Sequence, residues 1–564
     1  QYAENVPTRG IFSSVEHLIH FGLGKHDQVD RLIVRWPDGK TQEWKNLPAN
    51  QRLIVQHKDA TGHSNSIAPT SVPRQMYHGS TLSGYAHQEN EFNDFEVYPL
   101  IPWTESDQSP LMAVGDVNND GLDDFFIGNS FDQSPALMIQ KPNGSFTQAT
   151  PSFWEQENVY EDHGAVFFDA DRDGDLDLYV ISGGWEAKKD IAKLAWENRL
   201  YINLDGKGTF TRARGVIPEL PSVAQRVAPF DYDEDGDLDL FVGGRLTPDN
   251  WPLTPGSVIL RNDNDHFTDV TSSVGPDFAK CGMVTDLQWA NLDQDPGLEL
   301  VVVGEWMPVT VFKMKDGKLV NHSKGTIPPD RHGLWYRLAI ADLDQDGDLD
   351  LVTGNLGLNT RLTASPEGPL RCFAADFDKN NTLDPIMAYY EDGQLYPLVQ
   401  KEVLHKHMPV LKKRLLKAKD YSVATIDKVW PQSDLDASLN LFAHTLETCW
   451  WENQNGKFIQ RKLPIQAQVA PVQGIIATDL NGDGHTDLFL AGNRYGMEVE
   501  TNPCNASNGI FLAGDGAGGF TWVDNTRTGI WTPGEVRDLA LLRGPQGKPV
   551  ILASNKNGPI QIFK

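Results

Sequence analysis

The sequence lacks the features that define three large classes of protein. It has only four cysteines in 564 residues, and none form a CxxC pair, which is too sparse for a disulfide scaffold. No run of about 18 apolar residues occurs, so no membrane span is predicted. The formal net charge of -28 argues against nucleic acid as a main partner, because phosphate contacts need a basic face.

The cysteines and the start of the chain leave two questions open. An even number of cysteines permits two disulfides, but we expect Cys281, Cys372, Cys449 and Cys504 to be buried free thiols. The chain starts at Gln1 without an initiator methionine or an apolar signal segment. This start predicts a processed or partial chain whose targeting signal lies outside it.

Acid is abundant and is concentrated in short stretches that recur. The stretch FDADRDGDLDLYV (168–180) has counterparts that start at residues 116, 231, 291, 342, 376 and 479. The first five copies in chain order, from 116 to 342, are spaced about 50 to 60 residues apart. An apolar strand precedes each copy, a second apolar strand follows it, and a glycine-bearing hairpin comes next. Each unit therefore predicts a four-stranded antiparallel sheet.

Repeated four-stranded units of this length are typical of propeller blades. We predict an all-β fold with a seven-bladed β-propeller, and eight blades remain open. The starts at 116, 169, 231, 291, 342 and 479 each lead a blade, and a metal-free seventh blade ends the chain. The copy at 376 is predicted on an outer strand of the fifth blade.

The acidic stretches have the spacing D-x-[DN]-x-[DN]-G-x-x-D, in which positions 1, 3, 5 and 9 offer side-chain oxygens and position 7 its carbonyl. Oxygen ligands at this spacing suit Ca²⁺. An EF-hand needs a glutamate at position 12 and flanking helices, whereas position 12 is Val180 in the 168–180 stretch and the flanks are strands. Acidic β-turns without metal are the alternative interpretation.

We expect about five or six Ca²⁺ sites, each supplied by one loop. The predicted ligands are Asp116, Asn118, Asp120, Leu122 and Asp124; Asp169, Asp171, Asp173, Asp175 and Asp177; Asp231, Asp233, Asp235, Asp237 and Asp239; Asp342, Asp344, Asp346, Asp348 and Asp350; Asp376, Asp378, Asn380, Thr382 and Asp384; and Asp479, Asn481, Asp483, His485 and Asp487.

Two copies depart from the pattern. The 376 copy has Asn381 in place of glycine, and asparagine tolerates the same left-handed conformation. The copy at 291 has Asn291, Pro296 and Glu299, so we expect it to be empty or weak. Millimolar extracellular Ca²⁺ suits such modules, which predicts an extracellular or outer cell-surface location.

The acidic loops and their strands resemble the FG-GAP or VCBS repeats of integrin-α-like propellers. The segment RGIFSS…HLIHFGLG…VDRLIVRWPDGKTQEWKNLPANQRLIV (9–55) resembles the ASPIC/UnbV domain, and HQENEFNDF, GEWMPV, GNLGLN and DFDKNNTLDPIMAYYEDG resemble secreted bacterial proteins that join the two. The architecture is similar to that of the cartilage acidic proteins. The resemblance implies a secreted or cell-surface Ca²⁺ protein of no settled activity, often with a further propeller before the ASPIC/UnbV part.

The predicted organisation has three parts. Residues 1–57 form a small β-rich domain, with strands at 29–36 and 41–45 around the turn Pro37-Asp38-Gly39 and a further strand at 51–56. Residues 58–75 are a polar linker, and residues 76–564 form the propeller. A helical insertion spans about 401–450, in which residues 403–430 predict a basic helix with a solvated face.

The turn after each second strand lies on the face opposite the metal loops. Propeller symmetry gathers these turns around the central channel, where glycines let a ligand approach. Their variety suits a peptide or sugar, although tight turns and space-filling tryptophans remain an alternative. The predicted ligand-binding residues are Asn129, Trp185, Glu186, Arg245, Glu305, Trp306, Asn355, Asn359, Asn493 and Arg494.

We therefore predict a calcium-stabilised binding or assembly module that recognises a protein or glycan at the cell surface. One alternative is an accessory subunit of an outer-membrane nutrient transporter. Another is an extracellular polysaccharide lyase or glycosidase, for which Glu186 and Glu305 are the candidate carboxylates. No HExxH or GxSxG motif supports catalysis.

Overall fold

The computed structural model describes residues 3–5, 8–10, 13–14, 16–63, 75–149, 154–184 and 195–564. The chain divides into two compact units, Gln1–Arg74 and Gln75–Lys564, and each is described by itself. None of the helices in the described part is both long and apolar enough to cross a membrane.

The first unit is built on one antiparallel hairpin. Strands β3 (Gln28–Arg35) and β4 (Lys40–Pro48) pair around the predicted turn, with Arg35 opposite Thr41, and the hairpin is confirmed. The strand predicted at 51–56 is wrong, because these residues pair with no strand and Ile54 is 75% exposed. The edge of β4 is taken instead by β5 (Gly62–His63). The other elements are β1 (Thr8–Gly10), β2 (Ser13–Ser14) and η1 (His57–Asp59).

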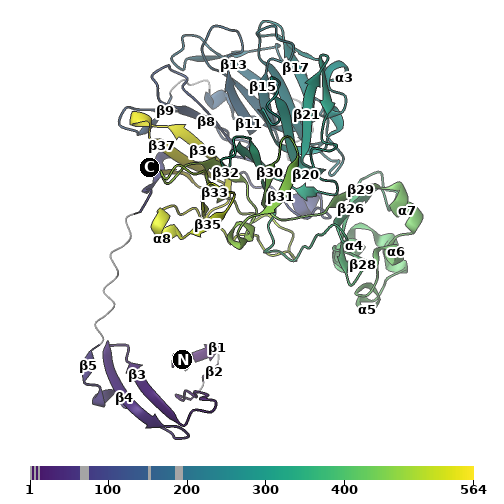
Figure 1. The fold of residues 1–564 in the computed structure, drawn as a ribbon. Helices are drawn as coiled ribbons and strands as arrows, with labels where there is room; N and C mark the ends of the chain where they lie inside the picture. The colour runs from purple at the N-terminus through teal and green to yellow at the C-terminus, as the bar shows by residue number, and fades with distance from the viewer. Residues whose placement is uncertain are drawn as a thin grey trace. The chain divides into compact units, whose positions relative to one another are not determined.

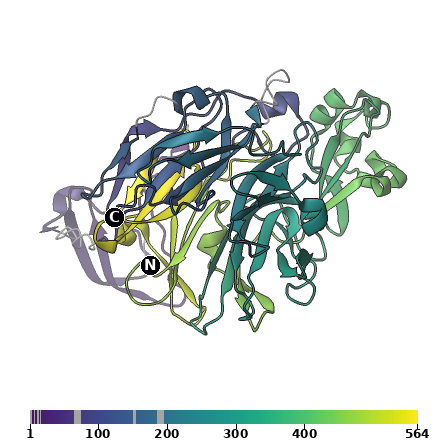
Figure 2. The same cartoon turned by 90° about the horizontal axis from the view of Figure 1, so that it is seen from above.

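The second unit is a β-propeller. Within the described residues, seven antiparallel sheets of four or five strands have first strands that contact one another in chain order, and the last contacts the first. We number these ring sheets one to seven; Figures 1 and 2 show them from two sides. The arrangement follows from the sequence because each unit presents apolar second and third strands that only neighbouring sheets can cover.

The strands of the ring sheets have the following bounds. The first has β7 (Met112–Gly115), β8 (Asp124–Ile127), β9 (Ala136–Gln140) and β10 (Phe146–Gln148); the second β11 (Glu161–Phe168), β12 (Asp177–Gly183), β13 (Arg199–Asn203) and β14 (Phe210–Ala213); the third β15 (Val223–Phe230), β16 (Asp239–Leu246), β17 (Val258–Asn262) and β18 (Phe267–Asp269); the fourth β19 (Met283–Ala290), β20 (Glu299–Pro308), β21 (Thr310–Lys315), β22 (Lys318–Asn321) and β23 (His332–Leu334). The fifth has β24 (Arg337–Ala341), β25 (Asp350–Gly354), β30 (Cys449–Asn453) and β31 (Phe458–Lys462); the sixth β32 (Gly474–Thr478), β33 (Asp487–Ala491), β34 (Ile510–Gly514) and β35 (Phe520–Val523); the seventh β36 (Val536–Arg543), β37 (Pro549–Asn555), β38 (Pro559–Phe563) and β6 (Gly79–Ala86).

The seventh ring sheet joins the two ends of the unit. Strand β6, from the start of the unit, pairs with β38 at its end, with Phe563 opposite Gly79. No sequence motif indicated this pairing, because β6 carries no acidic loop. It matters for stability, since it covers an edge of the last sheet and closes the ring.

The core lies between neighbouring sheets. Phe168 and Tyr179 of the second ring sheet pack with Leu240 and Leu260 of the third, and every residue of β12 is buried. Burial of both faces explains why the second strands read as continuous apolar runs. All four cysteines are free thiols, and Cys372, Cys449 and Cys504 are buried as expected, whereas Cys281 is only partly buried.

An inserted sheet interrupts the fifth ring sheet between β25 and β30. It contains β26 (Leu370–Ala375), β27 (Asp384–Glu391), β28 (Gln394–Pro397) and β29 (Leu439–Ala443), and it lies at one side of the ring (Figures 1 and 2). The loop at 376 joins β26 to β27. The prediction that it lies on an outer strand of the fifth blade is therefore wrong, because its flanking strands pair with β28 and β29 instead.

The basic segment is a series of short helices and not one helix, because Pro409 ends the first of them. Its apolar residues, such as Leu404, Leu411 and Trp430, pack in one cluster with Phe373 and Ile386 of the inserted sheet. The elements are α4 (Lys401–His407), η4 (Pro409–Lys413), α5 (Ala418–Tyr421), α6 (Ile426–Val429) and α7 (Gln432–Ala437). Elsewhere lie α1 (Asp94–Val97), η2 (Trp154–Glu157), α3 (Thr271–Val274), η3 (Phe278–Lys280), η5 (Ile465–Gln468), α8 (Asn525–Thr528) and η6 (Pro545–Gly547).

Candidate metal loops and the opposite face

The acidic loops join the first and second strands of six ring sheets and are anchored by their ninth residue. In the second ring sheet Asp177 is fully buried, and its two carboxylate oxygens accept from the backbone N–H of Ala170 and of Asn203, each at 2.8 Å. Asn203 lies on the third strand, so this carboxylate ties the loop to the sheet. The same two contacts recur at Asp124, Asp239, Asp350 and Asp487.

The first residue of the loop presents an unused oxygen. In the 169 loop, Oδ2 of Asp169 accepts from the N–H of Gly174 at 3.1 Å, whereas the buried Oδ1 has no hydrogen-bond partner. Asp231 and Asp342 have the same arrangement. A buried carboxylate oxygen without a donor is costly unless a cation compensates it.

Three carboxylates converge at each of these loops. Oxygens of Asp169, Asp171 and Asp177 lie within 4.8 Å of one another, which fits a hard cation such as Ca²⁺. The glycine at position 6 makes the turn possible, with φ of 91° at Gly174. The corresponding clusters are Asp231, Asp233 and Asp239; Asp342, Asp344 and Asp350; and, in the inserted sheet, Asp376, Asp378 and Asp384.

The predicted ligands at positions 5 and 7 of each loop are hydrogen-bonded to each other. Position 5 accepts the N–H of position 7 in each loop, as Asp173 does from Asp175 at 2.9 Å. The others that do so are Asp120, Asp235, Asp346, Asn380 and Asp483, bonded to Leu122, Asp237, Asp348, Thr382 and His485. Asn381, at the glycine position of the 376 loop, has φ of 67°, so its expected left-handed conformation is confirmed.

The 116 and 479 loops are less complete. Both oxygens of Asp116 accept backbone N–H groups, from Asp120 and Gly121, and both oxygens of Asp479 accept from Gly482 and Gly484. At position 3, Asn118 accepts from the N–H of Asp120, while the Nδ2 of Asn481 donates to Asp487 at 3.1 Å. These two loops therefore hold fewer free acceptors than the 169, 231 and 342 loops.

Sequence reasoning missed a set of ties between neighbouring loops. In three loops the residue at position 4, in a left-handed conformation, contacts position 7 of the loop in the next ring sheet. Asn119 donates to Asp175 at 3.0 Å, and Arg172 pairs with Asp237 at 2.9 Å. Gln345 contacts His485 at 3.0 Å. The only available signal was that position 4 carries a long polar side chain.

The 291 loop holds a cation of its own. The ammonium nitrogen of Lys313, on the third strand, lies 2.6 Å from Asp293, 2.6 Å from Asp295 and 2.7 Å from Glu299. These three carboxylates form the same kind of cluster as in the metal loops, and they raise the pKa of Lys313 against the opposing effect of burial. Lys313 stands opposite Glu299 in the strand register.

Burial controls the electrostatics of the loops. It raises the pKa of Asp177, Asp239 and Asp350 to about 7 each, and backbone hydrogen bonds only partly offset this. Asp124 is raised to about 7 in the same way. Burial, followed by the neighbouring carboxylates, also raises the pKa of Asp233. A bound divalent cation would reverse these shifts, because it favours the ionised carboxylates.

On the opposite face, the predicted asparagines are part of the turns themselves. Asn129 accepts from the hydroxyl of Tyr85 at 2.8 Å. Asn355 donates to the carbonyl of Thr445, and Asn493 to those of Ser507 and Gly534. These three are buried, whereas Asn359 is exposed and donates to the carbonyl of Val469. Trp185 and Glu186 lie outside the described residues.

The structure does bring three of the predicted residues together. Nη2 of Arg245 lies 2.9 Å from Glu305 and 2.9 Å from Glu105, a residue that sequence reasoning missed. Arg494 is 3.7 Å from Glu305, and Arg245 and Glu305 are each 1% exposed. Trp306 is also buried and stacks on Trp103 at 6.5 Å between ring centroids. No acidic loop precedes Glu105, so no repeated motif marked it.

Comparisons with known proteins agree with this architecture. The family described as "ASPIC and UnbV" matches residues 1–62, and the family described as "FG-GAP-like repeat" matches residues 116–180 and 291–353. Cartilage acidic protein 1 of Xenopus tropicalis is 27% identical over 295 residues, which are 50% of this chain and 42% of that protein. The chain thus spans less than half the length of this relative.

Similar solved structures include "YCF48 bound to D1 peptide", with a TM-score of 0.36 and 9% identity over 85% of this chain and 99% of that one. "Structure of Dos1 propeller" has a TM-score of 0.33 and 9% identity over 82% and 94%. Separate segments of the chain therefore match the ASPIC and UnbV family and the FG-GAP-like repeat family, and half of the chain is similar to cartilage acidic protein 1.

Proposed function

We propose that this chain is a calcium-stabilised extracellular binding module whose propeller has seven blades. The observation that carries the proposal is the buried Oδ1 of Asp169, Asp231 and Asp342, which has no hydrogen-bond partner inside a cluster of three carboxylates. Ca²⁺ would be held by these clusters and would neutralise their mutual repulsion. The likeness to FG-GAP-like repeats and to cartilage acidic protein 1 supports the same location and metal.

The metal has a structural part in this proposal. Each ion would fix the hairpin between the first and second strands of a ring sheet, at the face where neighbouring loops contact one another. In this proposal the clusters bind metal and have no part in binding a substrate. Glu305, a candidate catalytic carboxylate, forms an ion pair with Arg245. The described residues therefore favour a binding module over a glycosidase.

Isothermal titration of the metal-free protein with Ca²⁺ tests the proposal. We expect saturable binding of at least three ions, and Asp169→Asn, Asp231→Asn and Asp342→Asn should each remove one ion. The matched control is Asp205→Asn, an exposed aspartate of the hairpin between β13 and β14. A stoichiometry that none of the three loop variants changes would rule out these loops as the sites.

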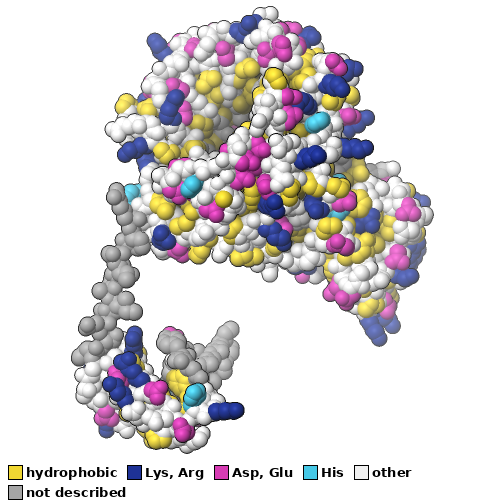
Figure 3. All heavy atoms as spheres, in the orientation of Figure 1, with side chains coloured by type: hydrophobic (Ala, Val, Ile, Leu, Met, Phe, Trp, Pro, Cys, Tyr) yellow, Lys and Arg dark blue, Asp and Glu magenta, His cyan; other side chains and the backbone are white. Residues whose placement is uncertain are grey.

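We propose further that a protein or glycan is recognised on the face opposite the loops. Exposed residues beside the buried turns would contact this partner, because Leu358 is 46% exposed and Tyr495 is 44% exposed. Leu358 directly precedes Asn359 in the chain, and Tyr495 directly follows Arg494. Figure 3 shows basic and acidic side chains interspersed over the visible surface, which gives no basic patch there for nucleic acid.

Tyr495→Ser and Leu358→Ser test the recognition surface, because both side chains are exposed and their loss should leave the melting temperature unchanged. Crosslinking on intact cells should capture a partner with the wild-type protein and lose it with the double variant. Capture that is equal for both proteins would contradict the assignment of this face.

A further inference from the structure

A small cavity lies where the first strands of the ring sheets begin and converge. Residues from six of the seven ring sheets or their adjoining turns line it, among them Arg226 of β15, Thr285 of β19 and Arg537 of β36. Among the described residues its lining contains five arginines and three glutamines but no carboxylate. The cavity therefore presents mainly hydrogen-bond donors, together with the unpartnered side-chain oxygen of Gln225.

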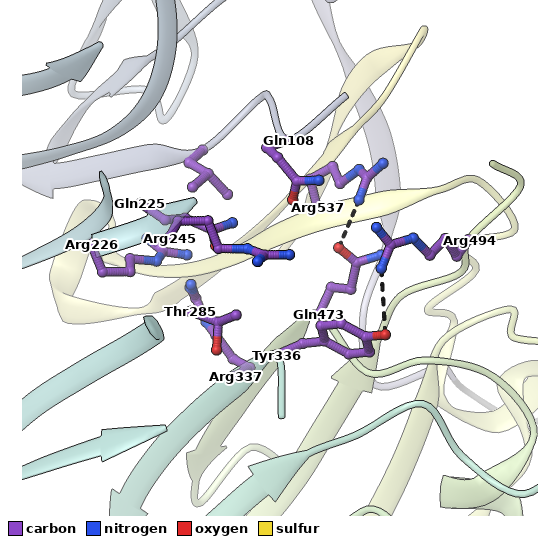
Figure 4. Close-up of a pocket in the computed structure, with 11 residues that line it drawn as sticks. Gln108, Gln225, Arg226, Arg245, Thr285, Tyr336, Arg337, Gln473, Arg494 and Arg537 are labelled. Carbon is purple, nitrogen blue, oxygen red and sulfur yellow. Dashed lines mark hydrogen bonds between the residues drawn. The ribbon is translucent and has the colours of Figure 1, made fainter. Parts of the chain in front are cut away.

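Arg245 is a buried residue of this lining that has unpartnered hydrogen-bond donors. Its Nη2 holds both Glu105 and Glu305 at 2.9 Å, whereas its Nε and Nη1 have no hydrogen-bond acceptor within the described residues. The side chain is 99% buried, at 1% exposure. Figure 4 shows its guanidinium extending into the space between Gln108, Gln473 and Tyr336.

Two further arginines point donors toward the same space. Arg494 donates from Nη1 to the hydroxyl of Tyr336 at 3.4 Å, and Arg537 donates from Nη1 to Gln473 at 3.0 Å (Figure 4). The Nε of each has no acceptor in the described part of the chain. Their carboxylate partners are not among the lining residues, and Glu535, for example, lies 2.8 Å from Arg537.

Such an arrangement is incomplete without an acceptor. A buried guanidinium N–H that lacks a partner is costly, and an anion satisfies it with a charge-assisted hydrogen bond. The cavity volume is about 20 Å³, where one water molecule needs roughly 10–15 Å³. Only a very small ligand fits this space.

We propose that the cavity binds one small monovalent anion, either a halide or a carboxylate group, through the unpartnered N–H groups of Arg245, Arg494 and Arg537. The shared chemistry is a single negative charge that offers one or two acceptor atoms to converging guanidinium groups. The anion would join the third, sixth and seventh ring sheets, in or next to which these three arginines lie. The proposal stands on these contacts alone and is independent of calcium.

Anion titration of the calcium-loaded protein tests the site, with bromide as the halide and formate as the carboxylate. The ionic strength is held constant with a bulky sulfonate buffer. We expect a saturable rise in melting temperature with at least one of the two anions, and the stronger response identifies the source. Diffraction at the bromide absorption edge should place the ion beside Arg245.

Arg245→Lys is the decisive variant, because lysine keeps a positive charge for Glu105 and Glu305 but has no second nitrogen to donate into the cavity. We expect it to fold and to weaken anion binding by at least about tenfold, since two charge-assisted donors are lost. The matched control is Arg261→Lys, at an arginine that pairs with Asp263 on the surface and is not among the residues that line the cavity.

If the Arg245→Lys variant does not fold, Arg537→Lys replaces it, since it removes the unpartnered Nε donor of a second anion-binding arginine and leaves the ion pairs of Arg245 intact. Three results would overturn the proposal. These are the absence of a saturable response to both anions, an equal response in the wild type and the folded variant, and diffraction that finds only water in the cavity.

Discussion

The 342 and 291 loops belong to neighbouring ring sheets and differ in how the repulsion between their carboxylates is balanced. Each gathers three carboxylates between the first and second strands. The 342 loop leaves the buried Oδ1 of Asp342 without a donor, whereas the 291 loop receives the ammonium group of Lys313. The comparison teaches that an acidic loop of this kind needs a positive charge, and that the chain can supply that charge covalently.

Removal of calcium should have the largest effect on this comparison. We expect chelation to lower the melting temperature by roughly ten degrees or more, because several ions bind only the folded state. Hydrogen exchange should then increase at the 169, 231 and 342 loops and stay unchanged at the 291 loop. Calorimetry with and without EDTA measures the first effect, and metal analysis must show that the ions are gone. Equal melting curves would contradict a structural part for calcium.

The second prediction breaks the built-in cation. Lys313→Ile should lower the free energy of unfolding by about 2–3 kcal/mol in EDTA, somewhat less than breaking a fully buried ion pair because Asp295 is half exposed. Added Ca²⁺ should restore part of this loss. The matched control is Lys462→Ile in β31, an exposed lysine whose side chain pairs with Glu447.

The double variant Lys313→Ile with Asn291→Asp sharpens the same test. It should raise the calcium stoichiometry by one ion, because the loop then offers carboxylates at positions 1, 3, 5 and 9. Calorimetric titration measures the calcium stoichiometry, and denaturant unfolding measures the free energy of unfolding of the variant. An unchanged stoichiometry would show that Pro296, and not Lys313, keeps calcium from this loop.

The third prediction concerns pH. Without metal, the pKa of Asp177, Asp239 and Asp350 in the folded state is about 7, well above the unfolded value of about 3.9. The folded protein then binds more protons than the unfolded one between about pH 4 and 7, so these groups add stability as the pH falls through that window. Calcium binding weakens over the same window, because protons compete for the carboxylates.

The difference in melting temperature between calcium and EDTA should therefore shrink as the pH falls from 7.5 to 5.5. Melting curves across that range measure it. The Lys313 cluster provides an internal comparison, since its lysine stays protonated and its local hydrogen exchange should not change. A difference that is constant with pH would argue against these buried aspartates as ligands.

The smallest effect is expected at the ties between loops. Arg172→Ala removes the pair with Asp237, and because Arg172 is half exposed the cost should be about 0–1 kcal/mol and should fall with added salt. Denaturant unfolding at low and high salt measures it. A loss well above this range would mean that neighbouring loops fold as one coupled unit.

Much of the fold was predictable because the repeat is local. The acidic loops, their flanking strands and the hairpin around Pro37-Asp38-Gly39 follow from the order of residues within about 20 positions. The strand predicted at 51–56 and the single helix at 403–430 failed because periodicity alone does not show whether a partner strand exists, or where Pro409 ends a helix.

The site divides in the same way. The sequence by itself determined which loops carry carboxylates at ligand spacing, since nearby residues of one loop necessarily converge. It also marked Arg245, Glu305 and Arg494 as candidate binding residues, although Arg245 and Glu305 lie within the second strands β16 and β20 and not in the turns predicted after them. Only the tertiary structure decided that Lys313 enters the 291 loop, that Glu105 shares Arg245 with Glu305, and that β6 closes the ring beside β38. These contacts join residues 14 to 484 positions apart, as Glu299 with Lys313 and Gly79 with Phe563, and chain closure over such distances is set by packing and not by local spacing.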